Sequence, residues 1–303
     1  MNESELPESI FEEYRKLGRK ITVTRGTYEI PVTCAVDDLD WNHMDQDHRP
    51  HVHRTYLEAA RIAVAPNFQI SVTQLRFFGV PLLIQVSDVR IRQGLFYQCY
   101  SLFNLIQIHA VIHSLPGKMY GERYIVSHPI LRFLHPFLDR KLHRLNAVQN
   151  EEDEPIRGRR AELRNRGYTF PPEERDFVTA NLRSNQTRFP EVGDHTVSLS
   201  NLEFEKLNVV QAGPVEFLVM PDATHAFSIW PAACPHEGGP LASGKLCGGG
   251  TEIICPWHGR KFAPLRLDDS KHEGTLGPFT LKLNRVEGWL QVTDSRTAGN
   301  AWE

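Results

Sequence analysis

Three segments in the first half of the chain alternate between apolar and polar residues. They span residues 21–36, 82–92 and 95–112. Successive side chains of a β-strand point to opposite faces, so this alternation predicts three strands. The third segment has apolar residues at positions of both faces, which indicates a sheet that is covered on both sides.

Apolar residues recur every three or four positions between residues 130 and 145, and this period predicts an amphipathic helix. A second helix is expected from about Glu154 to Arg166, where Gly167 would end it. Helices that follow a run of strands favour an α+β fold, in which the helices pack on an antiparallel sheet.

A different pattern begins near residue 171. Residues 171–194 start with two prolines, carry mixed charge and show no period, so we expect a linker or a segment that wraps around its neighbours. The short alternating segments that follow predict an all-β domain; they lie at residues 196–199, 208–210, 215–220, 279–283 and 289–293. We therefore predict two domains, at residues 1–190 and 191–303.

Composition narrows the class of protein. The 303 residues are 41% hydrophobic with a formal charge of −3, which is typical of globular domains and gives no sign of a nucleic-acid or membrane-surface partner. The N-terminus is acidic and amphipathic rather than a targeting leader, and no segment is long and apolar enough to span a bilayer. Five cysteines at unrelated spacings do not make a disulfide framework, so we expect a reduced, cytoplasmic setting.

Two short motifs carry the strongest chemical information. One is Cys234-Pro235-His236 and the other is Cys255-Pro256-Trp257-His258. Two thiolates on one iron and two neutral imidazoles on the other make a Rieske [2Fe–2S] cluster. Prolines and glycines in both motifs would supply tight turns. We therefore predict that Cys234, His236, Cys255 and His258 hold such a cluster.

A zinc site is the main alternative, but structural zinc usually binds C-x2–4-C and H-x3–5-H pairs rather than mixed pairs. The segment from Cys234 to Phe262 resembles the Rieske domains of ring-hydroxylating oxygenases and their ferredoxins. Respiratory Rieske proteins resemble it less, because they carry an extra cysteine pair that bridges the two loops. Here Cys247 is the only additional cysteine near the loops.

Residues 40–53, DWNHMDQDHRPHVH, contain four histidines and three aspartates. They could simply begin a polar surface helix. A Rieske cluster transfers only single electrons, however, so a second metal centre is the feature to look for in the same chain. Two histidines and one carboxylate bind Fe(II) in non-haem oxygenases and leave positions for O2 and substrate. This segment can supply both histidines.

Two overlapping D-x-x-H-x4-H motifs occur in this segment. The first is Asp40/His43/His48 and the second is Asp45/His48/His53. Each resembles the iron-site motif of Rieske oxygenases, and they cannot both be correct.

We favour the second motif because it extends to a longer pattern. Chlorophyllide and pheophorbide oxygenases have N-x-x-D-x-x-H-x-P-x-x-H, and the matching residues here are Asn42, Asp45, His48, Pro50 and His53. Histidines five positions apart on a regular helix point in different directions. Pro50 lies where the helix would have to be broken for both to reach one iron.

The resemblance continues from residue 107 to residue 167, where the family has its last strand pair, a helix and an acidic segment whose last carboxylate binds iron. Glu151, Glu152 and Asp153 are the candidates here. Asp153 is our choice from its spacing to Pro155, whereas counting back from Gly158 selects Glu152. Alternatively, Asp153 would be the N-cap of the second predicted helix.

This resemblance implies a catalytic domain with the START-like helix-grip fold, although in the family the Rieske domain comes first and here it comes second. It implies a mononuclear Fe(II) held by His48, His53 and Asp153. It also implies that Asp45 links His48 to a cluster histidine, usually of a neighbouring subunit in a cyclic trimer. We accordingly predict a homo-oligomer, with a trimer favoured.

The activity that the resemblance implies is O2-dependent hydroxylation of an apolar polycyclic, aromatic or natural-product substrate. No G-x-G-x-x-G motif follows a strand, so electrons must come from a separate ferredoxin or flavin reductase. Candidate cavity walls are aromatic: Phe77, Phe78, Phe96, Tyr97, Tyr100 and Phe103. The rival hypothesis is a Rieske electron-transfer protein fused to a START-like module that binds a ligand without converting it.

Overall fold

The computed structural model describes residues 6–65, 67–77, 79–103, 105–170, 174–175, 182–183, 187–224 and 226–295. The chain forms two compact units. The first contains residues 1–158 and 175–182, and the second contains residues 159–174 and 183–303. Their division falls inside one long helix, between Gly158 and Arg159. The domain boundary expected between residues 190 and 191 stays a prediction.

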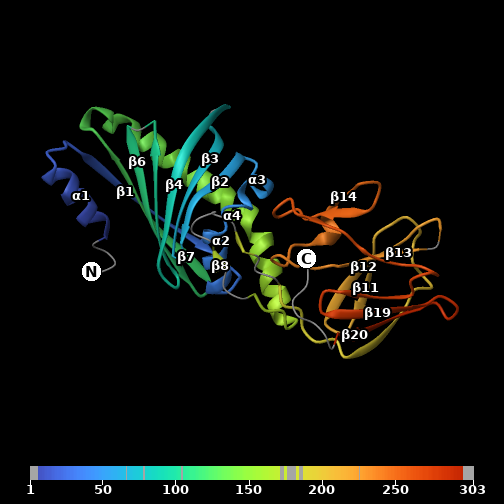
Figure 1. Cartoon of the computed structure of the whole chain (residues 1–303). Helices are drawn as coiled ribbons and strands as arrows, with labels where there is room; N and C mark the ends of the chain where they lie inside the picture. The colour runs from blue at the N-terminus through green and yellow to red at the C-terminus, as the bar shows by residue number, and fades with distance from the viewer. Residues whose placement is uncertain are drawn as a thin grey trace. The chain divides into compact units, whose positions relative to one another are not determined.

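The first unit is built on one antiparallel sheet (Figure 1). Its seven strands follow the order β1-β7-β6-β5-β4-β3-β2, so that β2 to β7 form a meander and β1 pairs with the last strand. The strands are β1 (Thr22–Pro31), β2 (Tyr56–Ala65), β3 (Phe68–Phe77), β4 (Val80–Arg92), β5 (Leu95–Leu102), β6 (Ile106–Leu115) and β7 (Lys118–Ser127).

Helices cover both faces of this sheet. On one face, Phe11 packs against Tyr124 of β7. On the other face, Leu138 packs in a cluster that includes Ile125 of the same strand. The helical elements are α1 (Leu6–Lys16), α2 (Val36–Met44), α3 (Arg49–Val52), η2 (Pro129–Leu134) and α4 (His135–Asn165). A meander closed by one long helix is a helix-grip arrangement, so the predicted α+β fold class is confirmed.

Two predictions about the strands need correction. The segment 95–112 is a hairpin of β5 and β6 and not one strand; Phe103 at its turn has a φ of 53°, and Leu105 N–H donates to Leu102 O. No glycine or proline marks this turn in the sequence. Strands β2 and β3 were not predicted, because β2 is interrupted by two irregularities and β3 buries polar side chains such as Gln69 and Ser71.

The two helices predicted after residue 128 are in fact one helix of 31 residues, α4, and the separation at Glu154 is wrong. Pro155 lacks a backbone donor and would usually end a helix. Here the apolar stripe continues beyond it, with Ile156 and Leu163 buried, so helical packing outweighs the lost hydrogen bond. Asp153 therefore lies inside the helix and is not its N-cap.

Apart from the end of α4 and one short 3-10 helix, the regular elements described in the second unit are β-strands, as expected. Its core contains Phe217, Phe279 and Leu281, and Leu163 of α4 joins this cluster. Most strands form two four-stranded sheets, β10-β20-β19-β18 and β11-β12-β13-β17, and a third sheet has the order β14-β15-β16. The elements are β10 (Asp194–Ser198), β11 (Asn208–Ala212), β12 (Val215–Pro221), β13 (Phe227–Pro231), η3 (Leu241–Ser243), β14 (Lys245–Cys247), β15 (Glu252–Ile254), β16 (Lys261–Phe262), β17 (Leu265–Leu267), β18 (Glu273–Leu276), β19 (Phe279–Asn284) and β20 (Trp289–Asp294).

The expected linker at residues 171–194 lies partly outside the described residues. Within the described part, β8 (Glu174–Arg175) pairs with β9 (Leu182–Arg183), and Thr169 forms a bridge with Arg188.

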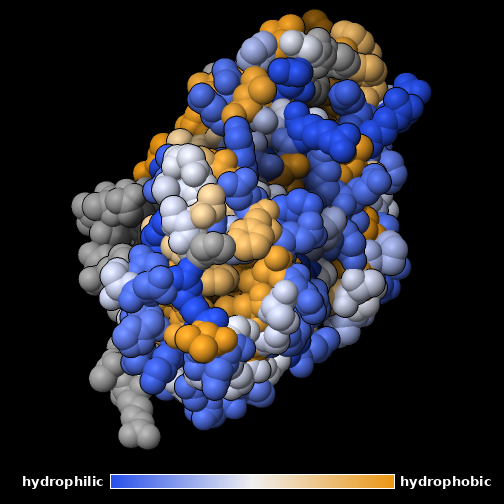
Figure 2. Space-filling view, turned by 90° about the vertical axis from the view of Figure 1, so that its right-hand side faces the viewer, coloured by the Kyte–Doolittle hydropathy of each residue, from blue (hydrophilic) through white to orange (hydrophobic). Residues whose placement is uncertain are grey.

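The face drawn in Figure 2 is mainly hydrophilic, with hydrophobic residues gathered in smaller areas.

Candidate metal centres

The second unit brings the two cysteine-histidine motifs together at the ends of strands. Cys234 follows β13 and Cys255 follows β15, and both thiols are buried. The Nδ1 atoms of His236 and His258 lie 3.3 Å apart, and their rings are nearly perpendicular at 82°. Two sulfur and two nitrogen donors thus converge in the second unit, which is the donor set of a Rieske cluster.

Backbone hydrogen bonds hold each motif in a tight turn. Gly238 N–H donates to Cys234 O, and Gly259 N–H donates to Cys255 O. Gly239 leaves space that any larger residue would fill, because an added Cβ would lie 2.7 Å from Cys255 Sγ. The glycines noted in the sequence therefore allow the two loops to approach each other closely.

The two thiols influence each other. A hydrogen bond from Cys234 lowers the pKa of Cys255 to about 7, whereas burial raises the pKa of Cys234. Cys255 can therefore lose its proton near neutral pH, and the thiolate is the form that binds iron. The four residues fit a [2Fe–2S] cluster by donor type and burial.

Two residues that support these loops were not predicted from the sequence. Glu237 is 2% exposed and places Oε2 3.7 Å from His258 Nε2, the ring atom on the far side from Nδ1. Thr187 donates from its hydroxyl to Cys234 O at 2.9 Å and from its backbone to Pro235 O at 2.6 Å. The neighbouring position of Glu237 in the first motif was the only available sign; nothing in the sequence pointed to Thr187.

The first unit positions His48 and His53 at the two ends of a very short helix. α2 ends at Met44, and α3 has only four residues, with Pro50 in its first turn. His48 is the N-cap of α3 and His53 is its C-cap. The two rings lie edge to face, with centroids 5.3 Å apart and planes inclined at 62°. The break predicted at Pro50 is therefore wrong: Pro50 lies in the first turn of α3, and the helix is interrupted before it, between Met44 and Arg49. The two histidines reach one place because they cap the two ends of α3.

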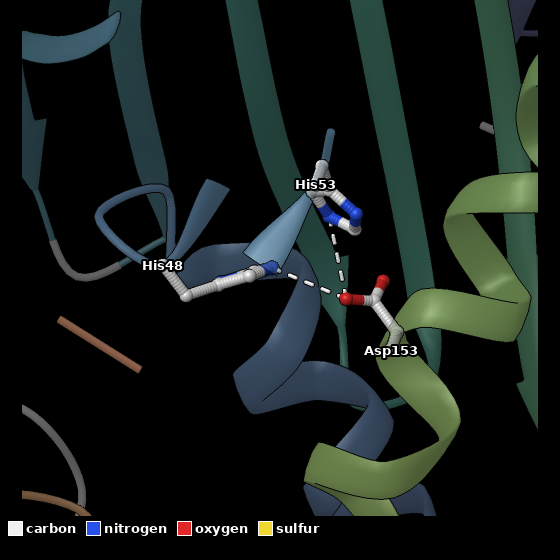
Figure 3. A group of neighbouring side chains, drawn as sticks. All are labelled: His48, His53 and Asp153. Atoms are coloured by element: carbon white, nitrogen blue, oxygen red, sulfur yellow. Dashed lines mark ion pairs between the residues drawn. The ribbon is translucent and has the colours of Figure 1, made fainter. Parts of the chain in front are cut away.

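Asp153 reaches the same place from α4 (Figure 3). Its Oδ1 lies 3.3 Å from His48 Nε2 and 3.3 Å from His53 Nε2. The three groups are close enough to surround one metal ion. The structure therefore brings together the three predicted iron ligands, from segments about a hundred positions apart.

A second carboxylate lies behind each histidine. Asp45 Oδ2 is 3.3 Å from His48 Nδ1, and Glu152 Oε2 is 3.1 Å from His53 Nδ1. Such carboxylates hold the ring with its other nitrogen directed at the metal. Asp45 is itself fully buried and lies 3.3 Å from Nη2 of Arg61. Glu152, the alternative third ligand, is thus on the opposite side of His53 from Asp153 Oδ1.

The electrostatics of this cluster fit a cation. Both ring nitrogens of His48 and Oδ1 of Asp153 are buried, and none makes a hydrogen bond within the described residues. Burial disfavours a charged His48, but Asp153 and Asp45 outweigh this effect and raise the pKa of His48 to about 9. Burial alone would raise the pKa of Asp153, but His48 lowers it to about 2. A positive charge at this position, a proton or a metal ion, is therefore stabilised.

The other motif of this segment is not assembled. The Asp40 carboxylate accepts a hydrogen bond from the backbone of Gly94. His43 is in contact with Met119 Sδ at 3.3 Å and packs on the ring of Phe96. Asn42, which matches the longer pattern, is buried beside the three-residue cluster and lines the same cavity.

The His48, His53 and Asp153 side chains line a cavity of about 130 Å³. Its walls combine aliphatic side chains with aromatic, polar and charged ones; the aliphatic residues include Leu75, Ile84, Val86, Leu102, Ile108 and Leu142. This is the type of concave, mainly apolar site that binds small molecules.

Most of the aromatic walls expected from the sequence lie elsewhere. Tyr100 does line the cavity. Phe96 packs under His43, Tyr97 is hydrogen-bonded to His109, and Phe103 is exposed at a turn. Phe78 and the side chain of Phe77 lie outside the described residues. The aromatic residues that do face the cavity include Tyr28 and Tyr56, which sequence analysis did not select.

Comparison with known proteins supports the description of the second unit. Residues 195–273, which contain both cluster loops, match the Rieske [2Fe–2S] domain family. The second unit thus contains a Rieske domain, and the implied cofactor is a [2Fe–2S] cluster. No curated protein matches the sequence. Within the described residues, no helix has the length and apolar character needed to cross a membrane.

Several solved structures have a similar backbone over part of the chain. The di-domain ARO/CYC StfQ from the steffimycin biosynthetic pathway is 17% identical, with a TM-score of 0.41 over 50% of this chain and 55% of its own. The di-domain ARO/CYC BexL from the BE-7585A pathway is 12% identical, with a TM-score of 0.39 over 45% and 50%. Truncated norcoclaurine synthase from Thalictrum flavum is 12% identical, with a TM-score of 0.38 over 46% and 96%. The chain thus spans about half the length of the two di-domain proteins.

Proposed function

We propose that this chain is a Rieske-type non-haem iron oxygenase that uses O2 and external electrons to hydroxylate an apolar substrate. The observation that carries the proposal is the convergence of His48, His53 and Asp153 on the wall of an apolar cavity, in a chain that also contains a Rieske domain. Two histidines and one carboxylate are the ligand set of mononuclear Fe(II) oxygenases.

These three residues would hold the mononuclear Fe(II), and the iron would supply the activation of O2. The chain's own contribution is to orient the ligands. Asp45 lies 3.3 Å from His48 Nδ1 and Glu152 lies 3.1 Å from His53 Nδ1. These carboxylates would favour the tautomer with the proton on Nδ1, which would leave each Nε2 free to bind the metal. Because these carboxylates are buried or partly buried, they restrict ring rotation more strongly than solvent would.

Asp45 remains our proposed connection between His48 and a cluster histidine. Its carboxylate already lies beside His48 Nδ1 and is held by Arg61. Asn42 is the second residue that we assign to catalysis, because it lines the same cavity. Aliphatic walls would exclude water from the bound substrate and keep the reacting C–H group away from solvent.

Reducing power in this proposal comes from a separate ferredoxin or flavin reductase that docks on the Rieske domain. The homo-oligomer, with a trimer favoured, and the cytoplasmic location stay predictions that accompany this function. The substrate is a small apolar molecule that fits among the aliphatic side chains of β3 to β7.

A second function is favoured by one specific observation. Without a metal, a protonated His48 between Asp45 and Asp153 is already stabilised, as its raised pKa indicates. The cluster could therefore be a structural ion-pair network. The chain would then be a Rieske electron-transfer protein whose first unit binds a ligand without converting it.

Iron and acid-labile sulfide analysis separates these two functions. After anaerobic reconstitution with Fe(II), we expect three irons and two sulfides per chain, falling to two irons in His53→Ala. His51→Ala is the matched control, because His51 is an exposed histidine of the same segment; it should keep all three irons. Two irons and two sulfides in every protein would contradict the oxygenase proposal and favour the electron carrier.

A further inference from the structure

The cavity beside His48, His53 and Asp153 is lined by more arginine than acidic side chains. Three arginines line it, namely Arg49, Arg123 and Arg157. Among its described lining residues, Asp153 is the only carboxylate. An apolar cavity with an excess of buried donors is suited to a ligand that brings its own acceptor.

Arg123 of β7 is the arginine with the most unused donor capacity. It is 3% exposed, and its Nη2 donates to the side chain and to the backbone carbonyl of Asp139, at 2.5 Å and 3.2 Å. Its Nε and Nη1 are buried and have no hydrogen-bond partner within the described residues. Leaving buried donors of a charged group unpaired is unfavourable, so a further acceptor at this position would be stabilising.

The other two arginines have different roles. Nη2 of Arg157 donates to the backbone and side-chain oxygens of Asn150 and to Glu154, so this guanidinium holds its own helix. Arg49 lies over the ring of Tyr56, 5.4 Å from its centroid. Arg123 is thus the donor that these contacts leave most available to a ligand.

The strands around Arg123 leave room for this arrangement. Gly26 is the cross-strand partner of Arg123, and a Cβ added there would lie 2.7 Å from Asp139 Oδ1. Two positions along, Gly121 lies under the ring of Tyr28, and an added Cβ would lie 2.1 Å from that ring. Glycine at both positions lets the Arg123–Asp139 pair and the Tyr28 phenol lie close to the sheet.

Two phenols accompany the guanidinium. Tyr28 and Tyr100 both line the cavity. Burial is the main influence on each phenol and raises both pKa values, and the charge of Arg123 lowers them by a smaller amount. Both phenols are therefore neutral hydroxyl groups that can donate hydrogen bonds to an anion.

We propose that the substrate is an apolar molecule bearing a carboxylate, which Arg123 binds with the help of Tyr28 and Tyr100 while the apolar body lies against the aliphatic walls. Arg123 is then a specificity-determining residue for the same cavity that contains the candidate iron ligands. The inference rests on the proposed function only in calling this molecule the substrate; binding of the acid itself is independent of iron.

The test is a comparison of acids with their amides. Benzoate, 1-naphthoate and decanoate, and the three corresponding amides, are titrated into the full-length protein, and binding is followed by calorimetry. At least one acid is expected to bind about tenfold more tightly than its amide, because a charge-assisted hydrogen bond replaces a neutral one. Arg123→Gln should remove this preference and leave amide binding within about threefold. Arg144→Gln, an exposed arginine of α4, is the control and should change neither affinity.

Asp139→Asn provides an independent variant in case Arg123→Gln does not fold. It removes the carboxylate that competes for the guanidinium, so the acid should bind several-fold more tightly than in the unaltered protein while the amide does not. If no acid binds more tightly than its amide, or if Asp139→Asn weakens acid and amide equally, the inference is overturned. Absence of a third iron from the unaltered protein in the separate iron assay would instead contradict the proposed function and leave this result standing.

Discussion

At the scale of single residues, the neighbouring acids Glu152 and Asp153 occupy different positions around His53. Asp153 Oδ1 faces Nε2 of both histidines, whereas Glu152 Oε2 faces His53 Nδ1. A carboxylate that faces the shared space between two imidazoles can bind a metal, and one behind a ring can only orient it. The one-residue ambiguity left by the sequence thus becomes a testable difference.

We expect Asp153→Asn to lose the mononuclear iron and Glu152→Gln to retain it with affinity reduced about 10- to 100-fold, the usual effect of removing an orienting carboxylate. Each variant is titrated with Fe(II) after the mononuclear iron has been removed, and binding at His48, His53 and residue 153 is measured. Sulfide content is the control that shows the Rieske cluster is intact. If Glu152→Gln loses iron and Asp153→Asn keeps it, the assignment of the third ligand is reversed.

His109, a buried histidine that is not one of the candidate metal ligands, gives a prediction about how the stability of the protein depends on pH. Its ring is buried between Tyr97, whose hydroxyl lies 2.5 Å from Nδ1, and Gln107, whose Oε1 lies 3.2 Å from Nε2. The edge of Phe11 covers the ring. These contacts suit a neutral imidazole with its proton on Nε2, and burial lowers the pKa of His109 to about 4.

A histidine with a lowered pKa binds its proton more readily in the unfolded chain. Its contribution to stability is therefore full above the unfolded pKa of about 6.5 and is lost as the pH falls toward 4. Between pH 7.5 and 5 we expect His109 to account for a loss of about 2 kcal/mol in the free energy of unfolding. Urea unfolding of the wild type and His109→Gln at both pH values measures this, and equal pH dependence in the two proteins would refute the assignment.

At the scale of elements, the packing of β1 on β7 depends on glycine. Tyr28 lies across Gly121, and the ring occupies the space that a Cβ would fill. Gly121→Ala should therefore destabilise the protein by about 1–3 kcal/mol through overpacking.

Gly158 of α4 has no atoms near the position of an added Cβ. Gly158→Ala is the contrasting variant and should stabilise by up to about 1 kcal/mol, from helix propensity. Thermal unfolding compares the two, and a Gly121→Ala protein as stable as the wild type would show that Tyr28 can move aside.

The elements also show where the sequence was informative and where it was not. Strands that bury apolar residues alternate visibly, as in β4, and were predicted from that period. β3 was not predicted, because its buried face carries the polar residues Gln69, Ser71 and Thr73. Buried positions in this strand therefore do not show up as apolar positions in the sequence. In α4, a local signal, Pro155, suggested a break that long-range packing overrides.

The candidate site divides in the same way. His48, His53 and Asp153 were selected because their chemistry and spacing are recognisable in short motifs, and the structure brings them together. Arg123 and Tyr28 were missed, because an arginine or a tyrosine on a strand gives no sign of the cavity it faces until the strands are paired. Short motifs can therefore predict the metal ligands, whereas the residues that line the cavity become visible only when the pairing of the strands is known.

At the scale of the whole molecule, the second unit begins earlier in the chain than its strands do. Leu163 is part of its core, and added side-chain atoms at Gly238 would lie 2.8 Å from Leu163 Cδ1. Arg160 Nη1 donates to Glu237 O at 3.4 Å, and Thr187 donates twice to the first cluster loop. The end of α4 and the residue at 187 therefore support the loop that carries Cys234 and His236.

This support predicts how truncated chains behave. A fragment of residues 159–303 should assemble a [2Fe–2S] cluster with Rieske absorption and electron paramagnetic resonance spectra. A fragment of residues 191–303 retains all four ligands but lacks Leu163 and Thr187, so it should lose most of its cluster or release it at a markedly lower temperature. Thr187→Val in the full chain tests the smaller part of this effect, because it removes the hydroxyl while keeping the side-chain volume. Equal cluster content and thermal stability in both fragments would mean that the strands alone define the Rieske domain, and that the boundary expected from the sequence is the functional one.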